Sequence, residues 1–146
     1  IVSVQNPYNL LNRTYEIGNA EISHRENVSL LAYSPLGFGV LSGKYLNNKK
    51  PAEARITKWP NYARYSSEQG TAATRSYVAL AMKYGLDPAQ MALAFVNEQA
   101  FVASNIIGAT TMLQLESNIA SVDIQLSREL RSDIEEVHNK YPNPSP

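Results

Sequence analysis

The chain has 146 residues, the length of one domain, and 44% of them are apolar, as in an ordinary globular protein. Thirteen basic and thirteen acidic side chains cancel, so a large basic surface for nucleic acid is not expected. The absence of cysteine excludes disulfides and thiolate metal sites and agrees with a cytoplasmic location. No apolar run reaches the roughly 18 residues that would span a membrane.

Three short apolar runs predict the strands of a parallel sheet that is covered on both faces. They are residues 1–4, 28–33 and 102–107, and polar or turn residues bound each of them. The long segments between them have helical patterns, which favours β/α repeats over hairpins. Because the chain begins inside a strand that needs neighbours on both sides, we expect it to be a fragment of a larger domain.

Helix signals occupy most of the remaining sequence. One helix is expected within residues 14–26, and others are expected to begin after the cap residues Ser67, Asp87, Thr111 and Ser127. Residues 36–65 show no convincing periodicity and predict a long loop that is either functional or disordered. Residues 141–146 are expected to form a flexible proline-rich tail that frays or lies along a surface.

The carboxyl ends of the predicted strands are the places to look for chemistry, because active sites of β/α barrels gather there. After the third strand, Gly108 would let a ligand approach the backbone, and the N–H groups that open the next helix favour an anion. Gln114 and Asn118 share one face of that helix, so a phosphate near Thr110 and an adenine beside them are chemically sensible. The alternative is that Thr111 and Gln114 form only a capping box.

Other residues are weaker candidates for a binding or catalytic role. The glycines of residues 37–44 have the wrong spacing for a phosphate-binding P-loop, although Lys44 could still meet a phosphate as a point charge. His24 and His138 are expected to be solvated, as are the acidic side chains of residues 133–136, so no metal site is expected. The aromatic side chains of the long loop either line a substrate cleft or pin the loop in place; they are Trp59, Tyr62 and Tyr65.

Three motifs together resemble the aldo-keto reductase family. Residues 33–45, Tyr-Ser-Pro-Leu-Gly-Phe-Gly-Val-Leu-Ser-Gly-Lys-Tyr, are similar to the segment after the seventh barrel strand. Residues 107–110, with Gln114 and Asn118, resemble the segment after the eighth strand, and residues 5–11 resemble the end of the sixth. They occur in family order and cover nearly the whole chain. Within the family, the resemblance is to the bacterial Tas-type reductases, a branch related to the β subunits of potassium channels.

The resemblance implies an α/β fold, namely the C-terminal portion of a (β/α)₈ TIM barrel with about strands 6 to 8. Residues 1–146 would then be a single partial domain that binds NADPH. The implied cofactor contacts are Gln5 and Tyr33 at the nicotinamide; Ser34, Pro35, Leu36, Gly37 and Lys44 at the pyrophosphate and ribose; Arg64 near the 2′-phosphate; and Gly108, Thr110, Gln114, Ser117 and Asn118 at the adenosine. Ser117 departs from the Glu of the branch, and Thr110 replaces Ser.

The family's catalytic Asp, Tyr, Lys and His lie on earlier strands, so no residue of this chain is assigned a catalytic role. The full-length parent is expected to reduce aldehydes or ketones with NADPH, and the fragment alone is expected to be inactive. Its partners would be a carbonyl substrate and the remainder of the barrel or another copy of the chain. Two alternatives remain open: a non-catalytic NADP(H)-sensing or interaction module of the same fold, and an α/β domain without nucleotide function.

Overall fold

The computed structural model describes all of residues 1–146, and its three strands form one parallel sheet in the order β1-β2-β3. The strands are β1 (Ser3–Pro7), β2 (Ser29–Tyr33) and β3 (Val102–Ile106), close to the three predicted runs. Because parallel neighbours cannot be joined by a hairpin, each connection crosses back through helices. The predicted β/α arrangement is therefore confirmed.

The helices, with η for 3₁₀ turns, complete the chain. They are η1 (Thr14–Ile17), α1 (Asn19–Glu26), η2 (Val40–Ser42), η3 (Leu46–Asn48), α2 (Arg55–Lys58), α3 (Glu68–Lys83), α4 (Pro88–Asn97), α5 (Met112–Ala120), η4 (Ser121–Asp123) and α6 (Arg128–Lys140). All the predicted caps are confirmed, since each cap side chain accepts a hydrogen bond from the backbone N–H three residues later; these are Ser67, Asp87, Thr111 and Ser127.

Two segments differ from their predictions. The single helix expected within residues 14–26 is two, because the chain turns out of helical geometry at Gly18, between η1 and α1. The long segment of residues 36–65 is not structureless, since it contains η2, η3 and α2. These helices span at most a turn or so, too short to leave a periodic pattern in the sequence.

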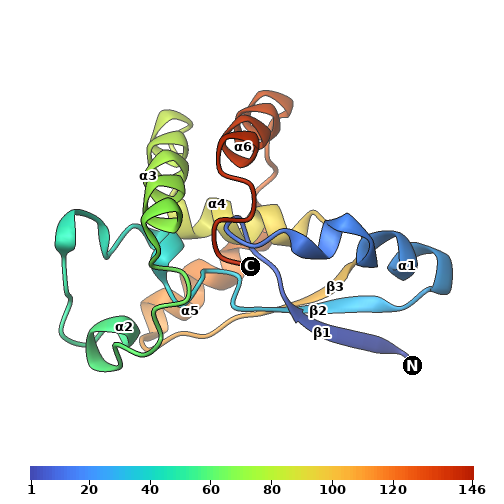
Figure 1. Ribbon diagram of the computed structural model, residues 1–146, viewed down its shortest axis with the longest axis horizontal. Helices are drawn as coiled ribbons and strands as arrows, with labels where there is room; N and C mark the ends of the chain where they lie inside the picture. Colours follow the sequence, from blue (N-terminus) through green and yellow to red (C-terminus); the bar gives the residue numbers. More distant parts are fainter.

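Helix α4 lies at the centre of the molecule, between the sheet and the outer helices (Figure 1). All of residues 91–96 are buried, which is the pattern of a helix that is surrounded by other elements. On β2, Leu30 and Ala32 are fully buried and belong to the same hydrophobic core as Phe95. Helices α3 and α6 stand side by side beyond α4 (Figure 1).

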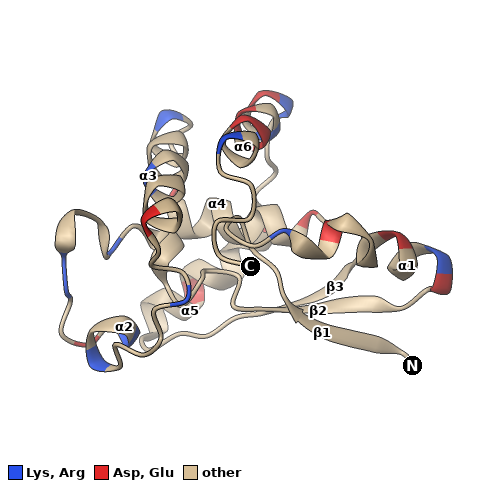
Figure 2. Cartoon of the chain, viewed as in Figure 1, with Lys and Arg blue, Asp and Glu red and all other residues tan.

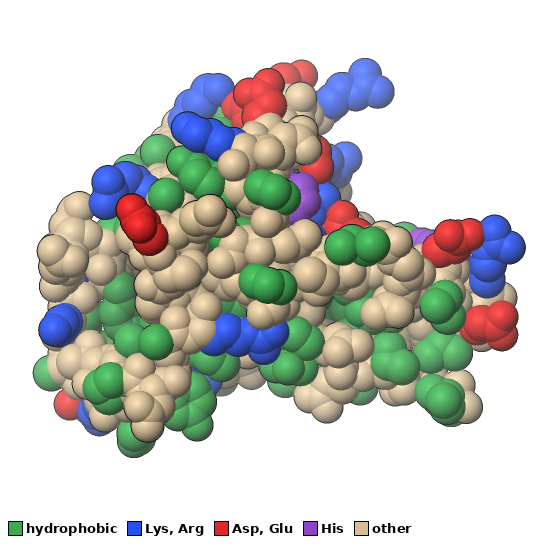
Figure 3. Space-filling model, in the orientation of Figure 1, with side chains coloured by type: hydrophobic (Ala, Val, Ile, Leu, Met, Phe, Trp, Pro, Cys, Tyr) green, Lys and Arg blue, Asp and Glu red, His purple; other side chains and the backbone are tan.

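The opposite face of the sheet is more open. Side chains alternate across a strand, so Leu31 and Tyr33 lie on the face away from Leu30 and Ala32, and both are half-buried. The in-register partner of Leu31 on β1 is Gln5, which is exposed, and β3 likewise has exposed side chains. Hydrophobic side chains reach the surface at the end of the sheet where the chain begins (Figure 3). Both sheet edges also lack a further strand.

A buried polar network fixes the segment after β1 to the last helix. Arg13 is 7% exposed and forms ion pairs with Glu16 at 2.7 Å and with Glu135 of α6 at 2.8 Å. The fully buried Tyr8 donates its hydroxyl hydrogen to Glu16. Burial and the nearby charge of Arg13 lower the pKa of His138, which is half-buried. The prediction of a solvated polar face on α6 holds for the exposed Glu135 and Glu136. It is wrong for the half-buried His138 and for Asp133, which is half-buried and accepts from Lys83 and Tyr84.

The last residues are held against the molecule. The backbone N–H of Ser145 donates to the carbonyl of Leu11 at 3.1 Å, and the carbonyl of Pro144 accepts from the hydroxyl of Ser67 at 3.1 Å. Residues 141–146 thus lie along the surface, which is one of the two arrangements that the sequence predicts for this tail. No helix of the structure has the length and apolar character that crossing a membrane requires.

Candidate functional site

The three strands end level with one another. Pro7, the last residue of β1, pairs in register with Tyr33, which in turn pairs with Ile106 of β3. The segments that follow therefore leave the sheet along one edge, and ligands of parallel α/β sheets bind outside this carboxyl edge. The structure thus brings the starts of all three predicted binding segments together.

The turn after β2 is held in a conformation that side chains rarely adopt. Ser34 and Phe38 have positive φ angles of 55° and 58°, which cost a non-glycine residue about 1 kcal/mol or more each. Hydrogen bonds offset this cost: the N–H of Gly37 donates to the carbonyl of Ser34 at 2.9 Å, and the same carbonyl accepts from the side-chain amide of Asn9 at 2.9 Å. Strain of this kind clusters at ligand sites.

An aromatic cluster supports this turn from behind. Gly37 has φ +54°, and a Cβ there would lie 3.2 Å from the ring of Tyr65, so glycine allows the close approach. The ring of Phe38 meets that of Tyr65 edge-on at 5.0 Å and that of Tyr62 at 5.4 Å. Trp59, in contrast, is 55% exposed. The sequence left two roles open for the loop aromatics, lining a substrate cleft or holding the loop in place. Tyr62 and Tyr65 hold the loop in place through their contacts with Phe38.

Two cations face this turn without an acidic partner. The side chain of Lys44 passes so close to Gly39 that a Cβ there would lie 2.7 Å from its Nζ. Burial, and then the positive charge of Arg55, lowers the pKa of Lys44. Arg55 lies over the ring of Phe38 at 5.5 Å, and neither cation takes part in any of the salt bridges. Two like charges near one another, unneutralised by the protein, favour an anion between them.

Sequence reasoning missed Arg55. It stands in the stretch without periodicity, where no sequence pattern indicates which side chains lie near the turn of residues 34–39. A signal was present nonetheless: most charged residues between η2 and α3 are basic, as Figure 2 shows.

At the start of α5, the predicted adenosine residues contact one another. The side-chain oxygen of Gln114 accepts from both the N–H and the hydroxyl of Thr110 at 3.0 Å, while Thr111 caps the helix. Asn118 is 7% exposed and donates to the carbonyl of Gly108 at 3.4 Å. The carbonyl of Ser117 accepts from Gln90 of α4. The predicted cap of α5 by Thr111 is therefore present, and the residues just before the helix, 108–111, are exposed.

Arg64 lies elsewhere. Its Nε donates to the carbonyl of Pro146 at 3.1 Å, and it lines a recess of about 360 Å³ together with Tyr33 and Pro7. Arg64 thus lies beside Tyr33, which the sequence assigns to the nicotinamide end, and no hydrogen bond or ion pair joins it to α5. Gln5 is exposed on the open face, Pro35 is buried in the turn, and Leu36 is half-buried there. No cluster of three or more His, Cys, Asp or Glu side chains could hold a metal ion.

The chain is thus an α/β protein with a parallel sheet, and a basic, glycine-rich turn lies at the carboxyl edge of that sheet. Residues 1–139 match the aldo/keto reductase family, and the chain belongs to that family. Its sequence is 57% identical to Protein tas of Escherichia coli K12 over 146 residues, which is all of this chain and 42% of the relative. It is 34% identical to an aldo-keto reductase of Babesia bovis over 97% of this chain and 53% of the relative.

A solved structure with the same fold is that of a glycerol dehydrogenase from Gluconobacter oxydans. It superposes with a TM-score of 0.75 at 24% identity and covers 97% of this chain and 43% of the dehydrogenase. The chain thus has the fold of part of a β/α barrel, as the sequence predicts. It spans about half the length, or less, of the relatives that it matches.

Proposed function

We propose that this chain supplies the cofactor-binding part of an NADPH-dependent reductase of aldehydes or ketones. In this proposal the catalytic Asp, Tyr, Lys and His belong to the remainder of the barrel, which also covers the open face and edges of the sheet. The chain by itself would then bind no carbonyl substrate productively. A second copy of the chain could cover the same face, but it would not supply the catalytic side chains.

The observation that carries the proposal is the pair of unneutralised cations at the carboxyl edge. A pyrophosphate beside Lys44 would meet a half-buried cation, where an ion pair is stronger than on an open surface, and the exposed Arg55 would add a second positive charge nearby. The side chain of Lys44 already lies across the turn of residues 34–39, where the implied contacts Ser34, Pro35, Leu36 and Gly37 stand. The residues present therefore fit a dinucleotide phosphate.

The two ends of the cofactor have matching surroundings. Tyr33 stands on the open face and offers a flat ring for stacking, and Gln5, two residues before the β1 partner of Tyr33, has an amide that can pair with a carboxamide. At the far end, nothing crowds Gly108, so a ligand can approach its backbone closely. Thr110, Gln114, Ser117 and Asn118 then surround the adenosine at the start of α5.

In this arrangement, the residues of the chain bind and orient, and the bound nicotinamide supplies the hydride. Tyr33 blocks one face of the ring and directs transfer to the other. Lys44 and Arg55 neutralise the phosphates, and the buried Asn118 holds the backbone of Gly108 in place. For Arg64 to contact the 2′-phosphate, as the family resemblance implies, it would have to leave Pro146.

The test is a titration of the full-length protein with NADPH and NADH, followed by cofactor fluorescence. Lys44→Gln is expected to weaken NADPH binding about tenfold or more, because a hydrogen bond to a charged group contributes roughly 1.5–3 kcal/mol. The matched control is Lys58→Gln, a lysine of the same segment that is already paired with Glu53. Equal affinities for the wild type and Lys44→Gln would refute the proposed site. NADPH binding without turnover of any aldehyde or ketone would favour the non-catalytic alternative.

A further inference from the structure

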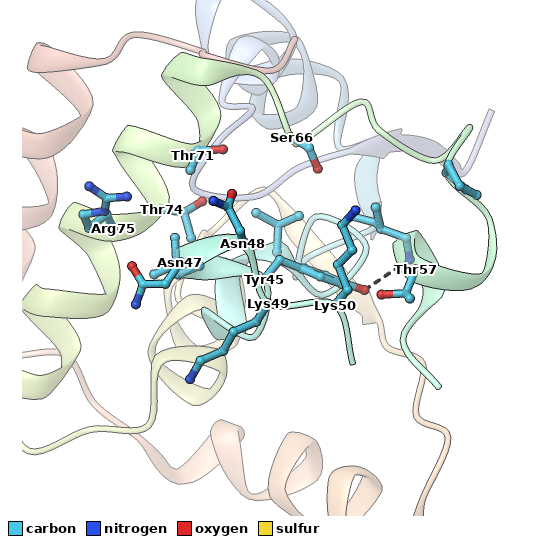
Figure 4. A pocket seen from close by; sticks show the side chains of 14 residues that line it. Tyr45, Asn47, Asn48, Lys49, Lys50, Thr57, Ser66, Thr71, Thr74 and Arg75 are labelled. Atoms are coloured by element: carbon cyan, nitrogen blue, oxygen red, sulfur yellow. Dashed lines mark hydrogen bonds between the residues drawn. The ribbon is translucent and has the colours of Figure 1, made fainter. Parts of the chain in front are cut away.

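A second cavity lies between η3, α2 and α3, and it is lined by none of the proposed cofactor residues. Its volume is about 570 Å³, enough for a small organic molecule. Thr71, Thr74 and Arg75 of α3 border one side, while Lys50 and Thr57 border the other (Figure 4). Lys44 and Arg55 do not line it, so it is separate from the pair of cations at the turn.

The charge of the cavity is of one sign. Lys49, Lys50 and Arg75 line it, no acidic side chain does, and none of the three forms a salt bridge. This differs from Lys58, which stands one residue beyond the lining residue Thr57 and is neutralised by Glu53. Three uncompensated cations from two separate segments create a positive potential within a concave surface, where field lines are focused.

The cavity also contains hydroxyl groups that have no partner. Thr74 is fully buried, lines the cavity, and its Oγ1 forms no hydrogen bond. This is unusual, because a helical threonine can bond to the carbonyl of the preceding turn. The half-buried Thr57, on the opposite side, likewise has a buried and unpaired Oγ1. A buried hydroxyl without a partner costs about 1–3 kcal/mol, so a ligand that accepts from it would recover that cost.

We propose that this cavity is a second anion site, which binds a small molecule bearing a phosphate group. A phosphate dianion would neutralise the positive charge of Lys49, Lys50 and Arg75, and its oxygens can accept a hydrogen bond from an unpaired threonine hydroxyl of the cavity. The volume leaves room for a small organic group on the phosphate, so free phosphate and a phosphate monoester share the required chemistry.

The test uses the full-length protein, titrated calorimetrically with inorganic phosphate and with glycerol 3-phosphate, each with and without saturating NADP⁺. Saturable binding with a Kd of about 1 mM or tighter is expected in the presence of NADP⁺. Tighter binding of glycerol 3-phosphate identifies a monoester site, and equal affinity identifies a site for the phosphate group alone. Glycerol is the uncharged control and is expected not to bind.

Three variants assign the binding to this cavity. Thr74→Val keeps the side-chain shape and removes the unpaired hydroxyl, and it is expected to weaken phosphate binding about fivefold or more without loss of folding. The double variant Lys50→Gln/Arg75→Gln changes exposed side chains and is expected to weaken binding more than tenfold. Lys58→Gln is the matched control and is expected to bind as the wild type does.

Two results would overturn the proposal. The first is the absence of saturable binding up to about 10 mM phosphate in the NADP⁺-loaded protein, or displacement of phosphate by NADP⁺, which would place the anion in the cofactor site. The second is unchanged binding in both Thr74→Val and the double cation variant. These readouts measure phosphate binding, whereas the test of the cofactor site measures NADPH binding, so either proposal can fail without the other.

Discussion

Substitution of two neighbouring glycines separates the role of Lys44 from the stability of its turn. Gly39 and Gly43 have φ angles of +88° and +78°, so alanine at either position costs about 1–2 kcal/mol of folding free energy. The added methyl groups meet different neighbours. At Gly39 the new Cβ would lie 2.7 Å from the flexible end of Lys44, whereas at Gly43 it would lie 2.9 Å from Cγ2 of the buried Val78.

The two variants should therefore differ in which property they lose beyond the shared cost of the backbone strain: NADPH affinity in one and further folding stability in the other. Gly39→Ala displaces the ammonium group of Lys44, and we expect NADPH affinity to fall about tenfold, the effect of losing one charged hydrogen bond. Gly43→Ala presses on α3, and overpacking adds roughly 1–3 kcal/mol to its loss of stability while leaving Lys44 free to bind. The assays are urea unfolding and fluorescence titration of the full-length protein. If Gly43→Ala weakens NADPH binding as much as Gly39→Ala, the proposed position of Lys44 against the phosphate is refuted.

Three further predictions concern the fold. Tyr8→Phe should lower the unfolding free energy by roughly 2 kcal/mol in urea titrations, because the buried hydroxyl donates to the charged Glu16; no loss would contradict that contact. Burial raises the pKa of Glu16, but hydrogen bonds from Arg13 and Tyr8 outweigh it and hold the pKa below the ordinary 4.5. Its stabilisation is thus complete above that value and is lost as the pH falls through the lower folded-state pKa, so Glu16→Gln should flatten stability measured between pH 5 and 3. The isolated 146 residues should self-associate or melt without cooperativity, since both sheet edges are unpaired, and a monomer with a sharp calorimetric transition would show otherwise.

The sequence predicts those parts of the fold that depend on local signals. The capping side chains of Ser67 and Asp87 act within one turn, and the buried run of residues 91–96 reflects its own composition. The bound tail depends on distant partners, such as the Leu11 carbonyl that accepts from Ser145. No window of sequence contains both members of such a pair.

The same distinction applies to the site. Gly108, Thr110 and Gln114 lie close together along the chain, and their contacts follow from the start of one helix. Arg55 and Arg64 stand in an aperiodic segment, and their positions are set by the Phe38 ring and the Pro146 carbonyl. Their roles could therefore be approached only with the tertiary structure, and the cofactor roles of all the assigned residues remain predictions.

The network around Arg13 has a consequence for the order in which the protein folds. Arg13 binds Glu135, 122 positions later, and its backbone N–H donates to Asn143, 130 positions later. Until the ribosome has delivered those residues, the guanidinium of Arg13 can pair only with the nearby Glu16, and its backbone N–H must stay hydrated. Contacts of such long sequence separation slow folding. The beginning of this chain thus completes its folding only after the end has emerged, which prolongs the time during which chaperones can engage it.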